Sequence, residues 1–187
     1  MQPNSSTVNT RTIAITGLSV ALLAVLAQIA IPLPVGVPIS LGTLGIVLVG
    51  IIFGAKRGVF IVLMYLLLGA IGAPVFAGFQ GGLGMFLDFA GGFRYSFPLL
   101  ALCAGVGHEL AERFNKPYIL WIGLIAGTLI NYTFGLSHFM LVTGMGFAEA
   151  VIAAVAPFVL GDLAKLAIGV ALATPIRNAL FSEQSSK

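Results

Sequence analysis

Two ionisable residues, Asp162 and Lys165, stand inside a long apolar stretch near the C-terminal end of the chain. Their spacing of three residues places both side chains on one face of a helix, where each can reach the other or a bound molecule. A charged group within a bilayer costs about 2.5–3.5 kcal/mol on insertion scales, so it normally faces a partner or a cavity. The two residues therefore form either a structural ion pair or part of a binding site, and both interpretations stay open.

Further polar residues interrupt apolar segments, and each has more than one role open to it. Arg94 can bind an anionic group or extend to the membrane interface. Asn131 can hydrogen-bond a neighbouring helix or a ligand, whereas His138 suits a hydrogen-bonded packing position better than a ligand position. Asp88 and Glu149 suit exposed or capping positions. Phenylalanines near Arg94 can face lipid or form the apolar wall of a pocket, and they stand at positions 76, 79, 86, 89, 93 and 97.

Motifs of known catalytic chemistry are missing from the sequence. The chain has no HExxH, GxSxG or GxxxxGK[ST] string and no Cys/His cluster, so it carries no zinc, nucleophile or Walker signature. We therefore predict no enzymatic activity, catalytic residue, metal or cofactor for this chain. An intramembrane enzyme that uses Asp162, Lys165 and His138 stays as a remote alternative, because no catalytic spacing supports it.

The composition excludes a soluble domain. Of the 187 residues, 59% are hydrophobic and 8% are charged, against about 25% charged in soluble domains, and the mean hydropathy is +1.09. Only helix bundles and closed barrels satisfy the backbone within a bilayer, and the long continuous apolar runs favour a bundle over alternating barrel strands. The net charge of +3 is scattered, which argues against nucleic acid as a partner, and the lone Cys103 excludes an internal disulfide.

The elements that must position these residues are six spanning helices in an all-α bundle. Apolar runs predict them at about residues 13–31, 41–54, 59–71, 95–110, 117–142 and 148–180. The last run is long for one span, and Pro157 can divide it. We expect a single membrane domain over 1–187, with a polar tail over 1–11, extended or turn backbone in the proline-rich segment 31–40, and a glycine-rich, partly buried outer loop over about 73–92.

The basic residues predict the orientation of the bundle. Seven of the nine Lys and Arg residues fall on one side of a six-span arrangement: Arg11, Lys56, Arg57, Arg113, Lys116, Arg177 and Lys187. The positive-inside rule then places both termini in the cytoplasm. Arg94 and Lys165 are the two exceptions, and with Asp162 they fall in the outer half of the bundle, which indicates a pocket that is reached from outside.

The first predicted helix carries a stripe of small residues. Ala14, Gly17, Ala21 and Ala24 recur at helical spacing, and Gly17 with Ala21 forms a small-xxx-small pair that permits close helix approach. The stripe can pack within the bundle of this chain or dock on a separate membrane subunit, and both interpretations stay open.

Four strings together resemble one family. They are IPLPVGVPISLGTLGIVLVGIIFGAKRG (31–58), GAIGAPVFAGFQGGLG (69–84), GGFRYSFPL (91–99) and GDLAK (161–165). Their order and spacing are similar to those of the BioY family, over nearly the whole chain from Leu18 to Leu180. The resemblance implies a six-helix, biotin-specific S component of an energy-coupling factor (ECF) transporter in a prokaryotic plasma membrane. It also implies a transmembrane coupling subunit, EcfT, and two ATPase subunits as partners.

The resemblance implies a set of biotin-binding residues. Arg94, Asp162 and Lys165 match the ligand positions of the family, Gln80 follows the PVFAG string, and Thr43 lies in ISLGT. We add Asn131 for its polarity near the middle of its helix, and the stripe Ala14, Gly17, Ala21 and Ala24 corresponds to the EcfT contact. The alternative function is a stand-alone secondary biotin carrier, driven by protons through Asp162 or His138.

Overall fold

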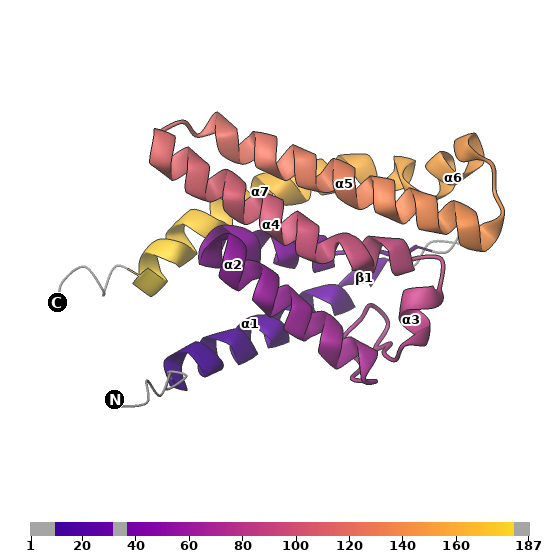
Figure 1. Ribbon diagram of the computed structural model, residues 1–187, viewed down its shortest axis with the longest axis horizontal. Helices are drawn as coiled ribbons and strands as arrows, with labels where there is room; N and C mark the ends of the chain where they lie inside the picture. The colour runs from indigo at the N-terminus through magenta and orange to yellow at the C-terminus, as the bar shows by residue number, and fades with distance from the viewer. Residues whose placement is uncertain (1–9, 32–36, 182–187) are drawn as a thin grey trace, which may run out of the picture.

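The computed structural model of the chain describes residues 10–31 and 37–181, and within these ranges its regular secondary structure is helical apart from two short strands. The elements are α1 (Thr10–Gln28), β1 (Ala30–Ile31), β2 (Ile39–Ser40), α2 (Gly42–Ala70), α3 (Gly84–Leu87), α4 (Gly91–Phe114), α5 (Tyr118–Thr143), α6 (Phe147–Ala154) and α7 (Ala156–Phe181). The long helices run along the long axis of the molecule (Figure 1). Among the described residues, α2, α5 and most of α7 are long and apolar enough to cross a membrane.

Helix α2 is broken at Gly54, and the chain reverses direction there. Gly54 has φ 76° and ψ 178°, which is not helical and favours glycine. A Cβ added at Gly58 would lie 3.0 Å from the Cα of Gly50, although eight residues of straight helix span about 12 Å. The two halves of α2 therefore pack against each other, and the break falls between the predicted spans 41–54 and 59–71.

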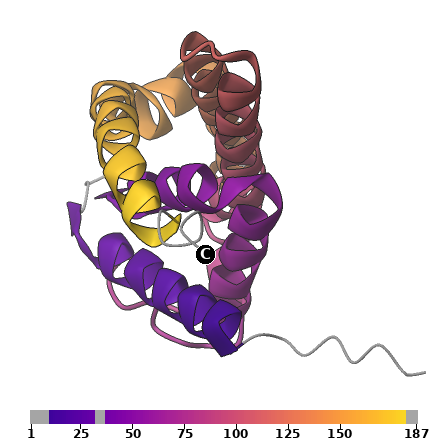
Figure 2. The ribbon, with the colours of Figure 1, turned by 90° about the vertical axis from the view of Figure 1, so that its left-hand side faces the viewer.

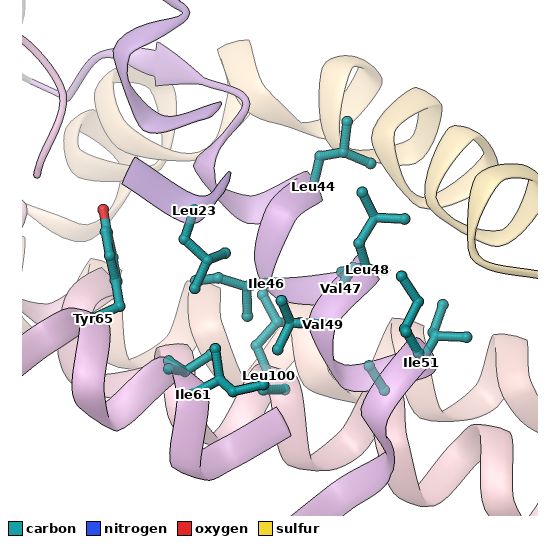
Figure 3. Close-up of a cluster of buried hydrophobic side chains, with 14 of the residues drawn as sticks. Leu23, Leu44, Ile46, Val47, Leu48, Val49, Ile51, Ile61, Tyr65 and Leu100 are labelled. Carbon is teal, nitrogen blue, oxygen red and sulfur yellow. The ribbon is translucent and has the colours of Figure 1, made fainter. Parts of the chain in front are cut away.

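The first half of α2 forms the centre of the bundle. Every residue from Leu44 to Ile52 is buried, and Figure 2 shows this purple segment surrounded by the other long helices. In Figure 3, side chains of this segment meet Leu23 of α1, Ile61 of the second half of α2 and Leu100 of α4. A helix that is apolar on all sides suits the interior of a protein or a membrane span, and this one occupies the interior of the bundle.

Helix α4 approaches α2 and α5 at glycines, which form a seam through the bundle. A Cβ at Gly50 would lie 2.7 Å from the carbonyl oxygen of Ala101, and one at Gly123 would lie 2.6 Å from that of Cys103. A Cβ at Gly107 would also come within 3.1 Å of the Cα of Gly123. Small residues let helix backbones approach this closely within a membrane.

Two segments begin or end at different residues from those predicted. The long run 148–180 divides at Val155 (φ −128°, ψ −53°) into α6 and α7, and Pro157 stands in the first turn of α7, where proline is tolerated. The expected loop over about 73–92 instead contains the short helix α3, and α4 begins at Gly91 rather than Tyr95. Asp88 accepts a hydrogen bond of 2.8 Å from the N–H of Ala90 just before this helix.

The described chain places its connections at two opposite ends. The start of α1, the break in α2, the α4–α5 connection and the end of α7 lie toward the left of Figure 1, whereas α3, α6 and the paired strands β1 and β2 lie toward the right. At the left end, the Arg177 guanidinium is 3.0 Å from a Glu112 carboxylate oxygen, and the Glu109 carboxylate accepts from the N–H of Ala55 at 2.8 Å. These bonds join α7, α4 and the second half of α2.

Candidate functional site

The Asp162 carboxylate of α7 is held by two donors. Lys165 Nζ lies 2.8 Å from Oδ1, and the Tyr132 hydroxyl of α5 donates to Oδ2 at 2.6 Å. Lys165 Nζ also donates to the Thr43 hydroxyl of α2 at 3.3 Å. Asp162 and Lys165 are 9% and 7% exposed, so the ion pair that the sequence suggested is formed, and it is hydrogen-bonded to two other helices.

Asn131 places its amide oxygen in the same pocket as this ion pair. Its Nδ2 donates to the carbonyl oxygen of Phe93 at 3.0 Å and to the Ser96 hydroxyl at 2.7 Å. Both amide hydrogens are therefore used between α5 and α4. No partner of Oδ1 is recorded among residues 10–31 and 37–181, and Asn131 lines the same pocket as Asp162. The amide oxygen can accept a hydrogen bond from a ligand.

A pocket opens over these polar groups, and we call it the Lys165 pocket. Its empty space, including the part open to solvent, is about 410 Å³. Its lining consists of Val37, Pro38, Ser40, Thr43, Phe93, Phe97, Asn131, Tyr132, Phe158, Asp162 and Lys165. Below it, a smaller recess of about 270 Å³ reaches Val47 and Thr128. The pocket combines a few convergent polar groups with aromatic walls, as small-molecule sites do.

A second pocket, which we call the Arg94 pocket, adjoins the first. It holds about 460 Å³ of empty space by the same measure. Ala27, Gly42, Tyr65, Phe76, Ala77, Ala90 and Arg94 line it, together with Val37, Pro38, Ser40, Phe93 and Phe97. These last five residues also line the Lys165 pocket. The two pockets therefore adjoin each other at these five residues, and each is lined by one cation, Arg94 or Lys165.

Arg94 lies in the first turn of α4 and is buried with an acidic partner. It is 8% exposed, and its Nη1 is 2.7 Å from Asp88 Oδ1 and also donates to the carbonyl oxygen of Met85. The guanidinium stands 5.2 Å from the centre of the Phe76 ring, within the range of a cation–π interaction. Arg94 thus turns inward instead of extending to the interface, and Asp88 is its counter-ion.

The segment 71–83 between α2 and α3 covers the Arg94 pocket, and we call it the lid. Phe76 of the lid is 2% exposed and lines that pocket. Gln80 pairs with Phe76 through its backbone, with N–O distances of 3.0 and 3.2 Å. Its side chain is exposed and is not part of either described pocket lining. The structure therefore does not bring the predicted Gln80 to the site.

The small-residue stripe of α1 points mostly away from the bundle. Ala14, Gly17 and Ala21 are exposed, and a Cβ at Gly17 would meet no atom within 4 Å. Ala24 differs, because it is half-buried and packs against the core. Packing inside this chain therefore does not explain the first three residues of the stripe.

Sequence reasoning located most of the polar site residues and missed others. Arg94, Asp162, Lys165, Thr43 and Asn131 all line the two pockets. Missing were Tyr132, which holds Asp162, and Tyr65 and Ser40, which line the walls. Of the phenylalanines considered for a pocket wall, Phe76, Phe93 and Phe97 line the Arg94 pocket. The available signal for Tyr132 was its position next to Asn131 in an apolar helix. His138, predicted to be a packing residue, lies 2.9 Å from the carbonyl oxygen of Asp88.

Comparison with known proteins gives consistent results. Residues 1–182 match the BioY family. The biotin transporter BioY of Rhodobacter capsulatus is 37% identical over 168 residues, which cover 84% of this chain and 88% of that protein. The probable biotin transporter BioY of Pyrococcus horikoshii is 34% identical over 161 residues, or 86% and 93% of the two chains.

A solved structure shares the fold. It is the crystal structure of the S-component for biotin from an ECF-type ABC transporter. It superposes with a TM-score of 0.82 over 95% of each chain, at 24% sequence identity. At that level of identity the match shows the fold, and the fold is that of a multi-helix membrane protein.

Proposed function

The chain belongs to the BioY family, and we propose that it captures biotin and mediates its uptake as the S component of an ECF-type ABC transporter. The curated relatives are biotin transporters that this chain covers over most of their length. ATP hydrolysis takes place on partner subunits in this proposal, because the chain carries no nucleotide-binding motif.

The observation that carries the proposal is the pair of adjoining pockets, each with polar groups, that share the aromatic residues Phe93 and Phe97. Biotin has a ureido ring with two N–H donors and one carbonyl acceptor, an apolar bicycle, and a valerate chain that ends in a carboxylate. Asp162 and the Asn131 amide oxygen can accept from the ureido N–H groups, while Lys165, whose ammonium has three N–H donors, can donate to its carbonyl. Each chemical part of biotin therefore has a matching surface.

We place the ureido ring in the Lys165 pocket and the carboxylate at Arg94. The N–H donors of biotin are both in its ureido ring, so only that end of the molecule needs hydrogen-bond acceptors. The acceptors Asp162 and Asn131 both line the Lys165 pocket. Arg94 offers a guanidinium, which suits carboxylate better than a neutral carbonyl. Phe93 and Phe97 line both pockets, and in this placement the bicycle and the methylene chain lie against them.

Titration of the detergent-purified chain with biotin and with biotin methyl ester tests both the proposed function and the proposed orientation of biotin. We expect Asp162→Asn to weaken both ligands, and Arg94→Gln to weaken biotin roughly 10- to 100-fold while the ester, which lacks the carboxylate charge, changes little. Arg113→Gln, at the opposite end of α4, is the matched control. Failure of the unsubstituted chain to bind biotin would refute the function. Equal losses for both ligands in Arg94→Gln would refute the orientation.

The exposed stripe of α1 is the proposed docking face for the coupling subunit EcfT. Ala14, Gly17 and Ala21 leave the backbone of α1 open to close approach by another helix. Ala21→Trp should therefore abolish uptake into cells while leaving biotin binding by the purified chain unchanged. Ala164→Trp, an exposed small residue on α7, controls for the added bulk. Unimpaired uptake by Ala21→Trp would rule out this face.

A stand-alone proton-driven carrier is the second candidate. The recess below Lys165 extends the polar site toward Thr128, which is the observation in its favour. His138 bonds instead to the Asp88 carbonyl, so a proton route in this candidate runs through Asp162. Biotin uptake in cells that lack the ATPases, abolished by an uncoupler, would support the carrier over the S component.

Six crossings with both termini in the cytoplasm describe the proposed topology in the plasma membrane. Helix α1, each half of α2, α4, α5, and α6 with α7 would each cross once. The reversal at Gly54 supports two crossings within α2, and the start of α1 and the end of α7 lie toward the same end of the molecule (Figure 1).

A further inference from the structure

Gln28, the last residue of α1, binds the main chain of the lid through both ends of its side-chain amide. Its Nε2 donates to the carbonyl oxygen of Phe76 at 3.0 Å, and its Oε1 accepts from the N–H of Phe79 at 2.8 Å. The same Nε2 also lies 3.3 Å from the carbonyl oxygen of Ala24, one turn back in α1. One side chain thus connects two segments that are about fifty residues apart in the sequence.

Gln28 binds the carbonyl oxygen of Phe76, and the ring of the same residue forms part of the site. It lines the Arg94 pocket and lies against the guanidinium at 5.2 Å. It also makes edge contacts with Tyr65 and Phe86, at centroid distances of 5.5 and 5.8 Å. A change in the lid backbone at Phe76 would therefore change the wall beside Arg94.

The lid needs support at this point because its backbone is unfavourable there. Phe79 has φ 57°, a left-handed conformation that is rare for residues other than glycine, asparagine and aspartate. Gly78 and Gly82 on either side have φ 73° and 99°, so this part of the lid depends on residues without a Cβ. The bond from Phe79 N–H to Gln28 fixes the one non-glycine residue of the lid that has a positive φ.

We propose that Gln28 is a latch that holds the lid closed over the Arg94 pocket and ties its position to α1. Gln28 is a positioning residue in this proposal, which rests on the proposed function because the gated ligand is biotin. A displacement of the C-terminal end of α1 would withdraw both hydrogen bonds from the lid at once. Since α1 also carries the exposed stripe, a subunit docked on that stripe would act on the lid through Gln28.

Biotin association and dissociation rates measured on the full chain test the latch. Gln28→Met keeps the length of the side chain but neither donates nor accepts, and Gln28→Glu keeps only the acceptor for Phe79. Ser19→Ala is the control, because Ser19 on the same helix donates only to the Ile15 carbonyl, at 2.8 Å. We expect Gln28→Met to raise the dissociation rate roughly tenfold and the association rate as well, with Gln28→Glu between it and the unsubstituted chain.

Hydrogen exchange of the lid, followed by mass spectrometry without ligand, gives a readout that is independent of biotin. The Phe79 amide should exchange faster in Gln28→Met and unchanged in Ser19→Ala. Unchanged rates and exchange in Gln28→Met would refute the latch while leaving the proposed function intact. A loss of binding capacity with normal kinetics in the remaining protein would also refute it, because that result indicates a purely structural role. If the unsubstituted chain bound no biotin, the proposed function would fail, and the exchange experiment would still decide whether Gln28 holds the lid.

Discussion

Asp162 and Lys165 form a buried ion pair within the apolar helix α7. We therefore expect that the protein does not tolerate either charged side chain without the other. The 2.8 Å contact between them is supplemented by Tyr132 and Thr43. Removal of one member of a buried pair leaves an uncompensated charge, whereas replacement of both by apolar groups of similar size is often close to neutral.

We therefore expect a strong coupling between substitutions of the pair. Asp162→Asn and Lys165→Met should each lower the stability of the ligand-free chain by about 3 kcal/mol, and the double substitution should cost less than the sum of the two. Thermal unfolding in detergent measures this, and biotin binding should be lost in the double variant even where stability recovers. Additive losses would show that the two side chains act independently.

Single residues were predictable from the sequence only where their type was out of place. A lysine or an aspartate in an apolar run is conspicuous, and both fell in the site. Tyr132 resembles any other aromatic residue of a membrane helix, and its hydroxyl matters only because the fold brings it to Asp162, 30 positions away. For the same reason the sequence favoured Gln80, which is exposed, and overlooked Gln28, whose role depends on where the lid lies.

At the scale of single elements, the break in α2 depends on Gly54. Its φ of 76° is unfavourable for any residue with a Cβ, and an added Cβ would lie 2.5 Å from Glu109 Oε1, the atom that binds the N–H of Ala55. Gly54→Ala should therefore lower the free energy of unfolding by about 1–3 kcal/mol. Gly146→Ala is the matched control, because Gly146 has φ −67° and open space around it. Equal thermal stability of the two variants in detergent would contradict this account of the break.

Helix breaks were easier to predict than helix starts. Lys56 and Arg57 marked the reversal in α2, and Pro157 marked the division between α6 and α7. The start of α4 at Gly91 was hidden, because consecutive glycines usually indicate a loop. In the structure those glycines allow close packing, since a Cβ at Gly92 would collide with the Phe134 carbonyl and the His138 side chain of α5. Tertiary contact therefore overrides the weak helix propensity of this segment.

At the scale of the whole molecule, the distribution of charge predicts how the protein lies in the membrane. Lys56, Arg57, Arg113, Lys116 and Arg177 belong to the connections and helix ends near the start of α1 and the end of α7. From the positive-inside rule we predict that this end lies in the cytoplasm. The two pockets would then open toward the outside, where biotin is taken up.

Cysteine labelling in intact cells tests this orientation. In a Cys103→Ser background, Glu149→Cys, which is exposed near the start of α6, should react with a membrane-impermeant maleimide added to whole cells. Lys116→Cys, which is exposed in the α4–α5 connection, should react only after the cells are broken. The reverse pattern would place the pockets on the cytoplasmic side and would contradict the proposed direction of capture.

The glycine seam between α2, α4 and α5 has a consequence for how such a chain can diverge over time. Positions such as Gly50 and Gly123 have no room for a side chain, whereas Leu141 and Leu160 are 83% and 82% exposed and need only stay apolar. Inherited changes can therefore accumulate on the outer surface without moving the helices. A lineage can exchange much of its lipid-facing surface while it keeps the same framework.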